Sequence, residues 1–271
     1  MIEIEHVSKS YEEYKVLDDV STQIPKGCIT AFIGPNGAGK STLLGIITRM
    51  NKADGGRILV DGKDVKDYDT SALARKISVL RQNNNLHLRI TVKELVSFGR
   101  YPYAKGNLRA EDKRIVEEAI QYMGLVPLKD RYIDELSGGE QQRAFIAMVV
   151  AQDTDYIFLD EPLNNLDMKH SVEIMSMLRR LCQEKEKTVV IVIHDINFAS
   201  CYSDRILAIQ GGKIRVNDTV DAVITPKMLK SVYNMDFQVY DIEGDKISVY
   251  YKKKHHRRGK HYSRGVHRQN A

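Results

Sequence analysis

Gly34-Pro35-Asn36-Gly37-Ala38-Gly39-Lys40-Ser41-Thr42 stands directly after the short apolar run Ile29–Ile33. Its spacing matches the pattern G-x-x-x-x-G-K-[ST] of a phosphate-binding loop without a mismatch. Leucines and isoleucines then recur at helical spacing, so the sequence predicts a strand, a glycine-rich loop and a helix in that order. In such an arrangement, successive backbone N–H groups and the beginning of the helix face an anion. We therefore expect residues 34–42 to bind the phosphates of a nucleotide.

Lys40 and Ser41 carry the charged and the metal-binding group of this loop. We expect the Lys40 ammonium to reach the β- and γ-phosphates, and the Ser41 hydroxyl to ligate Mg²⁺. A glycine-rich turn that only begins a helix is the alternative interpretation. The unbroken spacing and the preceding strand favour the phosphate site.

An acidic pair, Asp160 and Glu161, ends the apolar run 156–159. Side chains at the carboxyl end of a buried strand emerge into the crevice where ligands bind. We expect Asp160 to hold Mg²⁺ and Glu161 to polarise the attacking water. Taken alone, such a pair is usually a solvated strand end, but a phosphate loop in the same chain favours the functional interpretation.

Composition restricts the class of protein. The chain has 271 residues, of which 42% are hydrophobic and 28% charged, as is typical of a folded globular protein. Its longest unbroken apolar run, 144–151, is far shorter than the ~18–20 residues that span a bilayer. The acidic, alternating start lacks the features of a secretory signal. Three cysteines without a CxxC pair indicate reduced thiols in the cytosol rather than a disulfide or zinc site.

The net charge of +5 is distributed unevenly. Residues 252–271 contain eight Lys or Arg and no acidic residue, so residues 1–251 carry a net charge of −3. The overall basic charge is therefore no argument for nucleic-acid binding, and we expect no specific nucleic-acid partner. We expect the tail to be a disordered, solubilising extension, because blocks of like charge are usually disordered. A tether to anionic lipid is the functional alternative.

Strand-like and helix-like segments alternate along the chain. Nearly all-apolar strands separated by helices predict a parallel or mixed sheet covered by helices. The middle of the chain is helical throughout, which suggests a subdomain inserted into that sheet. We expect strands at 2–7, 29–33, 57–60, 77–80, 156–159, 189–193 and 205–209, and helices near 91–99, 111–123, 139–152, 168–186 and 195–203. The expected parts are an α/β core (about 1–88 and 153–218), a helical subdomain (about 89–152), an appendage of one helix and two strands (about 219–251) and the tail.

The segment Leu136-Ser137-Gly138-Gly139-Glu140-Gln141-Gln142-Arg143 resembles the signature of ABC transporter ATP-binding subunits. It lies about 20 residues before the acidic pair, where that family has it. The resemblance covers roughly residues 1–250. It implies an α/β P-loop NTPase (RecA-like) core with an antiparallel β subdomain and an inserted α-helical signature subdomain. It also implies hydrolysis of ATP with Mg²⁺ as cofactor.

The signature has a chemical consequence for assembly. Ser137, Gly138 and Gly139 at the beginning of a helix form a second anion site, which in the family faces the γ-phosphate bound by the partner subunit. The resemblance therefore implies a head-to-tail dimer of two copies with ATP between them. An ordinary helix cap is also a fitting interpretation of Ser-Gly-Gly-Glu, and it does not compete with the first.

Three further residues match family motifs. Gln82 resembles the Q-loop glutamine, which senses Mg²⁺ and the permease, although Arg81 replaces the proline that often precedes it. His194 resembles the switch histidine that contacts the γ-phosphate. Asp167 resembles the D-loop aspartate, although Asn164-Asn165 replaces the usual Ser-Ala, which puts the detail of hydrogen bonding across the dimer in doubt.

An aromatic ring near the amino terminus is expected to stack on adenine. Tyr11 is in register with the family motif, and we favour it. Tyr14 stays open as an alternative, because the loop is slightly longer than usual.

The segments 90–103 and 193–199 narrow the resemblance to ATPases of iron-chelate and cobalamin importers, and within them to those for ferric siderophores, including petrobactin-type systems. This implies a peripheral subunit at the cytoplasmic face of the cell membrane. It would drive a permease docked near residues 83–103 and act with a substrate-binding lipoprotein only indirectly. The alternatives are a cobalamin or haem importer, an exporter, and a non-transport ATPase such as an iron–sulfur assembly factor. No residue of such an ATPase contacts the cargo, so none here identifies it.

Overall fold

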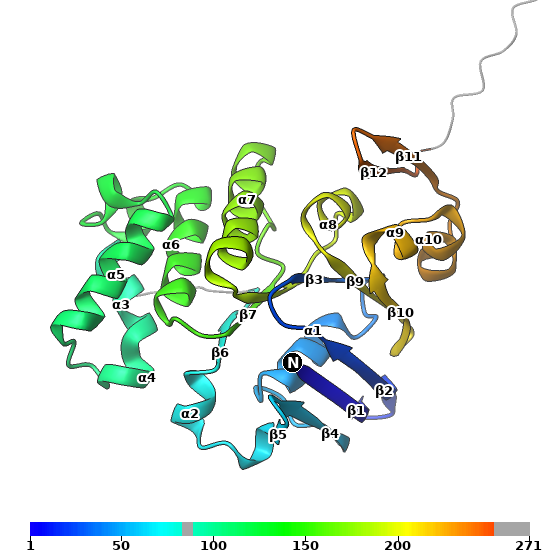
Figure 1. Ribbon diagram of the computed structural model, residues 1–271, viewed down its shortest axis with the longest axis horizontal. Helices are drawn as coiled ribbons and strands as arrows, with labels where there is room; N and C mark the ends of the chain where they lie inside the picture. Colours follow the sequence, from blue (N-terminus) through cyan, green and yellow to red (C-terminus); the bar gives the residue numbers. More distant parts are fainter. Residues whose placement is uncertain (83–88, 252–271) are drawn as a thin grey trace, which may run out of the picture.

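The computed structural model describes residues 1–82 and 89–251 (Figure 1). Part of the expected permease-docking segment and the whole basic tail lie outside the described residues. Strands gather in three sheets. The strands are β1 Ile2–Tyr11, β2 Tyr14–Ile24, β3 Ile29–Ile33, β4 Gly55–Val60, β5 Lys63–Asp64, β6 Ile77–Leu80, β7 Tyr156–Asp160, β8 Thr188–Val192, β9 Arg205–Gln210, β10 Lys213–Thr219, β11 Gln238–Ile242 and β12 Asp245–Val249.

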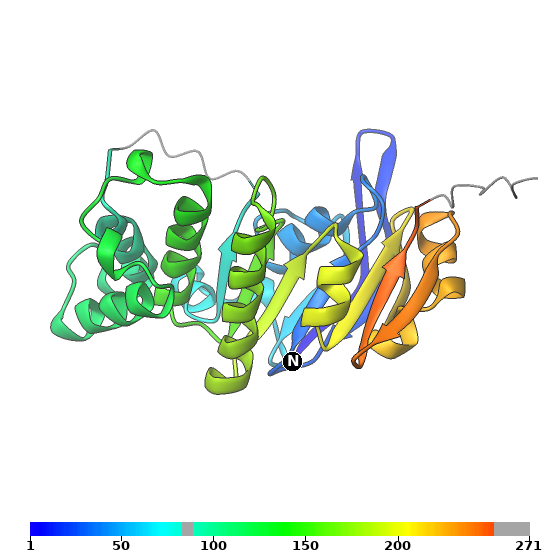
Figure 2. The same ribbon diagram turned by 90° about the horizontal axis from the view of Figure 1, so that it is seen from above.

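The helices cover the sheets and form a separate cluster at one end of the molecule (Figure 2). None of those described is long and apolar enough to cross a membrane. The α-helices are α1 Lys40–Ile47, α2 Thr70–Ala74, α3 Val92–Ser97, α4 Tyr101–Ala104, α5 Ala110–Tyr122, α6 Gly138–Ala151, α7 Met168–Lys185, α8 Ile196–Tyr202, α9 Val220–Val223 and α10 Pro226–Tyr233. Short 3-10 turns lie at Val65–Asp67, Phe98–Arg100, Val126–Leu128 and Ile133–Glu135.

The central sheet has six strands in the order β10-β9-β3-β8-β7-β6. All neighbours pair in parallel except β9 and β10, which are antiparallel. The carboxyl ends of β3, β7 and β8 therefore meet at one edge of the sheet, where ligands of such folds bind. This order places the glycine-rich loop, the acidic pair and His194 next to one another, although they are far apart in sequence.

Side chains alternate between two hydrophobic cores along each central strand. In β8, for example, Val189 and Ile191 face one core, whereas Val190 and Val192 face the other. The first core lies against the helices on one face, and the second against α1 and the strands near the amino terminus. Because both faces are covered, these strands consist almost entirely of apolar residues.

A second, antiparallel sheet has the order β2-β1-β4-β5 and packs over α1 (Figure 1). The fold class expected from the resemblance is thereby confirmed. We did not predict β2 from its periodicity, and its buried residues Leu17, Val20 and Ile24 explain why. Their spacing of three and four residues is that of a helix, because register shifts between β1 and β2 interrupt the usual alternation.

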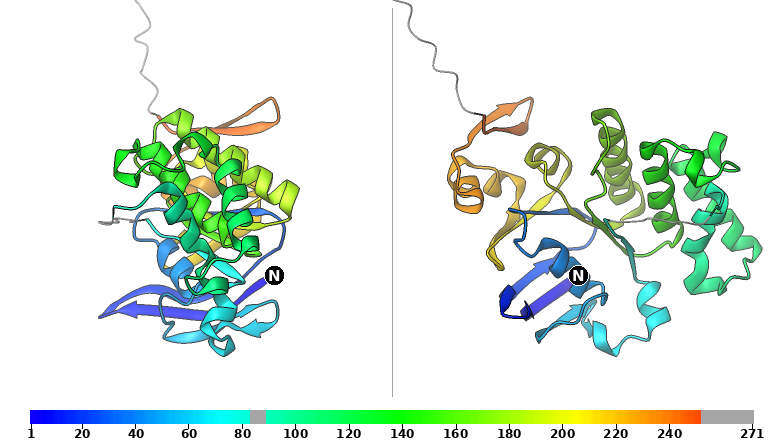
Figure 3. Two further views of the ribbon diagram at one scale, coloured as in Figure 1. Left: turned by 90° about the vertical axis from the view of Figure 1, so that its left-hand side faces the viewer. Right: turned by 180° about the vertical axis from the view of Figure 1, so that it is seen from behind.

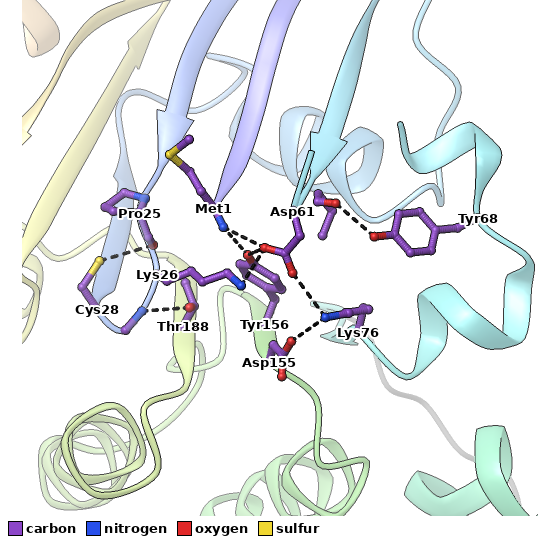
Figure 4. Close-up of polar contacts among 12 residues, drawn as sticks. Met1, Pro25, Lys26, Cys28, Asp61, Tyr68, Lys76, Asp155, Tyr156 and Thr188 are labelled. Carbon is purple, nitrogen blue, oxygen red and sulfur yellow. Dashed lines mark hydrogen bonds and ion pairs between the residues drawn. The ribbon is translucent and has the colours of Figure 1, made fainter. Parts of the chain in front are cut away.

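An ion-pair cluster around Asp61 joins the two large sheets (Figure 4). Its carboxylate pairs with Lys26 Nζ at 2.7 Å and with Lys76 Nζ at 3.2 Å, and the Tyr156 hydroxyl donates to it at 2.7 Å. The α-amino group of Met1 lies 2.9 Å away. Burial raises the pKa of Asp61, but these partners outweigh it and hold the pKa well below its usual value. The cluster therefore favours the ionised carboxylate in the folded protein.

Helices α3, α4, α5 and α6 form the cluster at one end (Figure 2). Arg100 ties three of its elements together, because its guanidinium donates to Asp112 at 3.0 Å and to the Ala151 carbonyl at 3.0 Å. Both side chains of this ion pair are almost fully buried. Each charge is thus paired, as a buried charge must be.

The residues after β10 lie at the opposite end of the molecule from α3 and α5 (Figure 3). They contain α9, α10 and the hairpin β11–β12, so two helices stand where we expected one. Asp221 at the beginning of α9 accepts from Lys246 of β12 at 3.0 Å, which fastens the hairpin to this helix.

Candidate functional site

The loop after β3 is held tightly by its surroundings. Gly34 has φ +142°, and a Cβ at this position would lie 2.0 Å from the Ile209 carbonyl oxygen. Only glycine fits there, because every other residue would clash with the backbone of β9. The residue that precedes α1 is Gly39, which has no side chain to cap the helix. The beginning of α1 is thus free of a side-chain cap and able to receive an anion.

Lys40 is buried and lies beneath this loop. Its Nζ donates to the Gly34 carbonyl at 2.8 Å and to the Pro35 carbonyl at 3.0 Å. Burial lowers the pKa of this ammonium, against the opposite influence of Glu161 and Asp160. The cation is therefore already positioned at the loop, satisfied by backbone carbonyls that a phosphate oxygen would replace.

Ser41, Gln82 and Asp160, the three expected metal ligands, line one cavity of about 260 Å³. The Ser41 hydroxyl donates to Asp160 Oδ1 at 2.8 Å. Burial raises the pKa of Asp160, and its neighbour Glu161 raises it further. Hard oxygen donors beside a phosphate loop suit Mg²⁺, which takes its other ligands from phosphates and water. The described residues contain no group of three or more His, Cys, Asp or Glu placed to hold a metal ion.

Glu161 is the centre of a hydrogen-bonded cluster at the end of β7. Gln82 Nε2 donates to its Oε2 at 2.6 Å, and His194 Nε2 lies 2.6 Å from its Oε1. The Asn164 amide donates to Oε2 as well. Glu161 has φ +51°, a left-handed conformation that is strained for this residue and that often occurs at functional sites. The structure thus brings the three residues expected to be catalytic, Glu161, His194 and Gln82, into direct contact.

A larger cavity of about 540 Å³ joins these groups. Residues 36–42 of the loop, Gln82, Glu161 and His194 line it, together with Tyr11 and Tyr14. Tyr11 and Tyr14 are partners across the β1–β2 hairpin and so project to the same side. Both are exposed, which leaves either ring able to stack on a base. The volume lies within the range of small-molecule sites.

Ser137, Gly138 and Asp167 are not brought to this cavity. Ser137 caps α6 by a reciprocal capping box, because the Glu140 N–H donates to its hydroxyl at 3.4 Å while its own N–H donates to the Glu140 carboxylate at 2.9 Å. Ser137 and Gly138 are exposed to solvent. Asp167 caps α7 through the His170 N–H at 2.9 Å. A single chain therefore holds one phosphate loop with a second, separate helix terminus that is open to another molecule.

Helices α6 and α7 touch each other at their beginnings. A Cβ on Gly139 would lie 2.6 Å from the His170 ring, so any larger residue would displace this ring. The same ring bonds Asp167 through Nδ1 at 2.9 Å. No pattern in the sequence predicts this contact between residues 31 positions apart.

Two contacts at the site were not predicted from the sequence. Asn164 was noted only as a departure from the usual D-loop, yet its amide bonds Glu161 within the same chain. Asn164 lies only three residues after Glu161, and this short separation could have suggested the contact. The Tyr233 hydroxyl accepts the Gly34 N–H at 3.1 Å across 199 residues of sequence. No local pattern could have suggested a contact of that separation.

Comparison with known proteins gives a consistent result. The family model described as ABC transporter matches residues 17–164. The petrobactin import ATP-binding protein YclP of Bacillus subtilis is 53% identical over 251 residues, which are 93% of this chain and 100% of that protein. The petrobactin import ATP-binding protein FatE of Bacillus anthracis is 44% identical over 92% of this chain and 100% of its own length. The ferric enterobactin transport ATP-binding protein FepC of Escherichia coli is 38% identical over 88% of each.

Solved structures show the same fold. A metal-chelate type ABC transporter in an inward-facing conformation superposes with a TM-score of 0.80, covering 93% of this chain and 98% of that chain at 24% identity. A dimeric bacterial ABC transporter cassette superposes with a TM-score of 0.73 at 31% identity, covering 81% of this chain and 99% of that chain. A post-hydrolysis state of that cassette is described as dimeric and bound to ADP and phosphate.

Proposed function

The chain belongs to the ABC transporter family of ATP-binding proteins, and from this premise we propose that it hydrolyses ATP to drive a membrane permease that imports a ferric siderophore or a related metal chelate. One observation carries the chemical part of the proposal. The phosphate loop, Glu161 and His194 converge on a single cavity of about 540 Å³, with Glu161 bonded to both Gln82 and His194. The names of the similar proteins support the cargo class.

The residues of the cavity suggest a division of roles. Residues 34–42 would hold the phosphates, with Lys40 moving from the Gly34 carbonyl to a phosphate oxygen. Ser41 and Asp160, with Gln82, would hold Mg²⁺, which neutralises the charge on the transferred phosphoryl group. Glu161 would orient and deprotonate the attacking water, and His194 would contact the γ-phosphate. Positioning and electrostatic stabilisation supply most of the rate enhancement in such reactions.

The complete site would require two copies of the chain. Ser137, Gly138 and Gly139 do not line the cavity beside the chain's own phosphate loop, and the first two are exposed. In a head-to-tail dimer, this helix terminus would face the γ-phosphate held by the other copy, and the exposed Asp167 would lie at the interface. The dimeric architecture of a similar cassette supports this arrangement.

The membrane partner would dock beside the helical cluster. Residues 89–103 belong to that cluster and come soon after Gln82 in the sequence. A permease contact there could therefore displace Gln82 and change its hydrogen bond to Glu161. The protein would then act as a peripheral subunit on the cytoplasmic face of the membrane. A cobalamin or haem importer, an exporter and an iron–sulfur assembly ATPase are the competing functions, and none of them is favoured by an observation on this structure.

Uptake in cells tests the cargo class. Cells whose only copy carries Lys40→Ala would be supplied with radiolabelled iron as a panel of ferric chelates, with a wild-type copy as control. We expect uptake of one chelate to be lost while uptake of the others persists. Unchanged uptake of every chelate, in a strain lacking redundant ATPases, would refute iron import and leave ATP hydrolysis in place. Uptake of labelled cobalamin in the same strain would distinguish the first alternative.

A further inference from the structure

The carboxyl-terminal part of the described chain reaches the phosphate loop through one side chain. Tyr233 is the last residue of α10, and its hydroxyl accepts a hydrogen bond from the Gly34 N–H at 3.1 Å. Gly34 is the first residue of the loop proposed to hold phosphate. The loop is therefore braced from outside the elements that the phosphate motifs identify.

Gly34 is restrained on three sides. Its carbonyl accepts from Lys40 Nζ at 2.8 Å, its Cα presses against the Ile209 carbonyl, and its N–H is held by Tyr233. A bound phosphate would take the place of the Gly34 carbonyl as the acceptor for Lys40 Nζ, so the bond from Lys40 would be lost. The orientation of the Gly34 peptide would then depend on Ile209 and on the Tyr233 hydroxyl.

Tyr233 is itself fixed by aromatic packing. Its ring lies 5.8 Å from that of Phe237, and the Phe237 ring lies 5.7 Å from that of Tyr250, which follows β12. Such tilted pairs are favourable geometries for aromatic rings. Phe237, the middle ring, is buried, whereas Tyr250 at the end of the row is exposed.

The hairpin that completes this row is fastened to the helix after His194. Ser248 of β12 and Asn197 of α8 exchange two hydrogen bonds, at 2.7 Å and 3.3 Å. The Ser200 hydroxyl of α8 donates to the Lys246 carbonyl at 2.6 Å. The segment 193–199 thus contains a residue, Asn197, to which the hairpin is attached. The appendage therefore contacts the loop at Gly34 and, separately, the helix α8 that follows His194.

We infer that Tyr233 is a positioning residue for the phosphate loop: its hydroxyl holds the Gly34 N–H and keeps the loop in the conformation that receives the nucleotide. The inference rests on the proposed phosphate role of residues 34–42. Without the hydroxyl, a largely buried N–H would lose its partner, and the loop would populate its binding conformation less often. The apparent affinity for nucleotide falls in proportion to the fraction of molecules in the binding conformation. The rate at saturating ATP changes little, because the bound phosphates restore the conformation of the loop.

The decisive variant is Tyr233→Phe, which removes one oxygen and keeps the ring. Tyr250→Phe is the matched control, because it removes the same atom from the same row of rings, and no hydrogen bond joins Tyr250 to the loop in the described chain. The full-length chain would be titrated with a fluorescent ATP analogue. For Tyr233→Phe we expect the Kd to rise about fivefold to tenfold, which is about 1–1.4 kcal/mol. For Tyr250→Phe we expect a Kd within about twofold of wild type.

Amide hydrogen exchange at Gly34, followed by NMR, gives a direct readout. It should become faster in Tyr233→Phe alone, since exchange reports loss of the protecting bond. The KM for ATP should rise with the Kd, while kcat stays within about twofold.

Three results would overturn the inference. The first is a wild-type Kd together with wild-type Gly34 exchange in Tyr233→Phe. The second is an equal rise in Kd for both variants, which would assign the effect to hairpin stability. The third is a lower melting temperature with unchanged Kd, which would leave Tyr233 a purely structural role. Failure of the wild-type chain itself to bind the analogue would instead refute the proposed function.

Discussion

We expect Glu161→Gln to abolish most ATP hydrolysis while leaving nucleotide binding intact. The replacement is nearly isosteric, so the side chain can keep its place at the end of β7. In wild type, Glu161 Oε2 accepts from Gln82 at 2.6 Å and from the Asn164 amide, while Oε1 lies 2.6 Å from His194 Nε2. The new amide satisfies the two amide donors with its oxygen, and its NH₂ group then faces His194. That contact is favourable only when His194 Nε2 is unprotonated and accepts.

The magnitude follows from what is lost and what is kept. No hydrogen bond joins Glu161 to residues 34–42 in the described parts of the chain, so the Kd for ATP should stay within about threefold of wild type. A positioned general base contributes about 10²–10⁴-fold to the rate. This range corresponds to about 2.7–5.4 kcal/mol of transition-state stabilisation. We therefore expect kcat to fall at least 100-fold while binding persists.

The assay measures phosphate release by the subunit reconstituted with its permease in liposomes, beside ATP binding by the isolated chain. Glu184→Gln is the control. Glu184 is exposed on α7, so this substitution removes the same charge at a position away from the site. It should match wild type in both measurements. Phosphate release by Glu161→Gln within about threefold of wild type would show that another group is the base, and the reasoning above would be refuted.

Three further outcomes are expected. Lys40→Ala should raise the Kd for ATP at least about tenfold by removing the cation at the loop, and an unchanged Kd in a binding titration would contradict its phosphate role. Tyr11→Ala should raise the Kd for ATP about fivefold and leave that for inorganic triphosphate unchanged, whereas the same result for Tyr14→Ala alone would assign stacking to Tyr14. Asp61→Asn should lower the free energy of unfolding by about 2–4 kcal/mol at pH 7 in denaturant titrations. Folding lowers the pKa of Asp61, so the ionised carboxylate stabilises the folded protein above the unfolded pKa of about 3.9. This stabilisation is lost as the pH falls below that value. The free energies of unfolding of wild type and variant should therefore converge in acid.

The sequence was sufficient for the parts of the fold in which local pattern and tertiary environment agree. The runs that became β3, β7 and β8 are nearly all apolar because they are buried on both faces, and an apolar run bounded by turns predicts a central strand. The phosphate loop is equally visible, since its glycines and its lysine must occur at fixed spacing.

Pattern failed where the local signal was weak or misleading. In β10, only Ile214 and Val216 are large and apolar, so nothing distinguishes this edge strand from a polar loop. In β2, irregular register produces helical spacing in a strand. The contact between Tyr233 and Gly34 needs two elements to be placed correctly before it can be inferred at all.

Two short series of contacts lie on either side of residues 164–167. Gly139 of the signature helix lies against the His170 ring, and His170 bonds Asp167 at 2.9 Å. Asn164, three residues before Asp167, bonds Glu161, which in turn bonds Gln82. The Gly139 backbone lies directly against this imidazole, so a displacement of α6 toward α7 would have to be accommodated by the His170 side chain or by α7. A single segment, residues 164–170, therefore contacts both the beginning of α6 and the carboxylate at the end of β7.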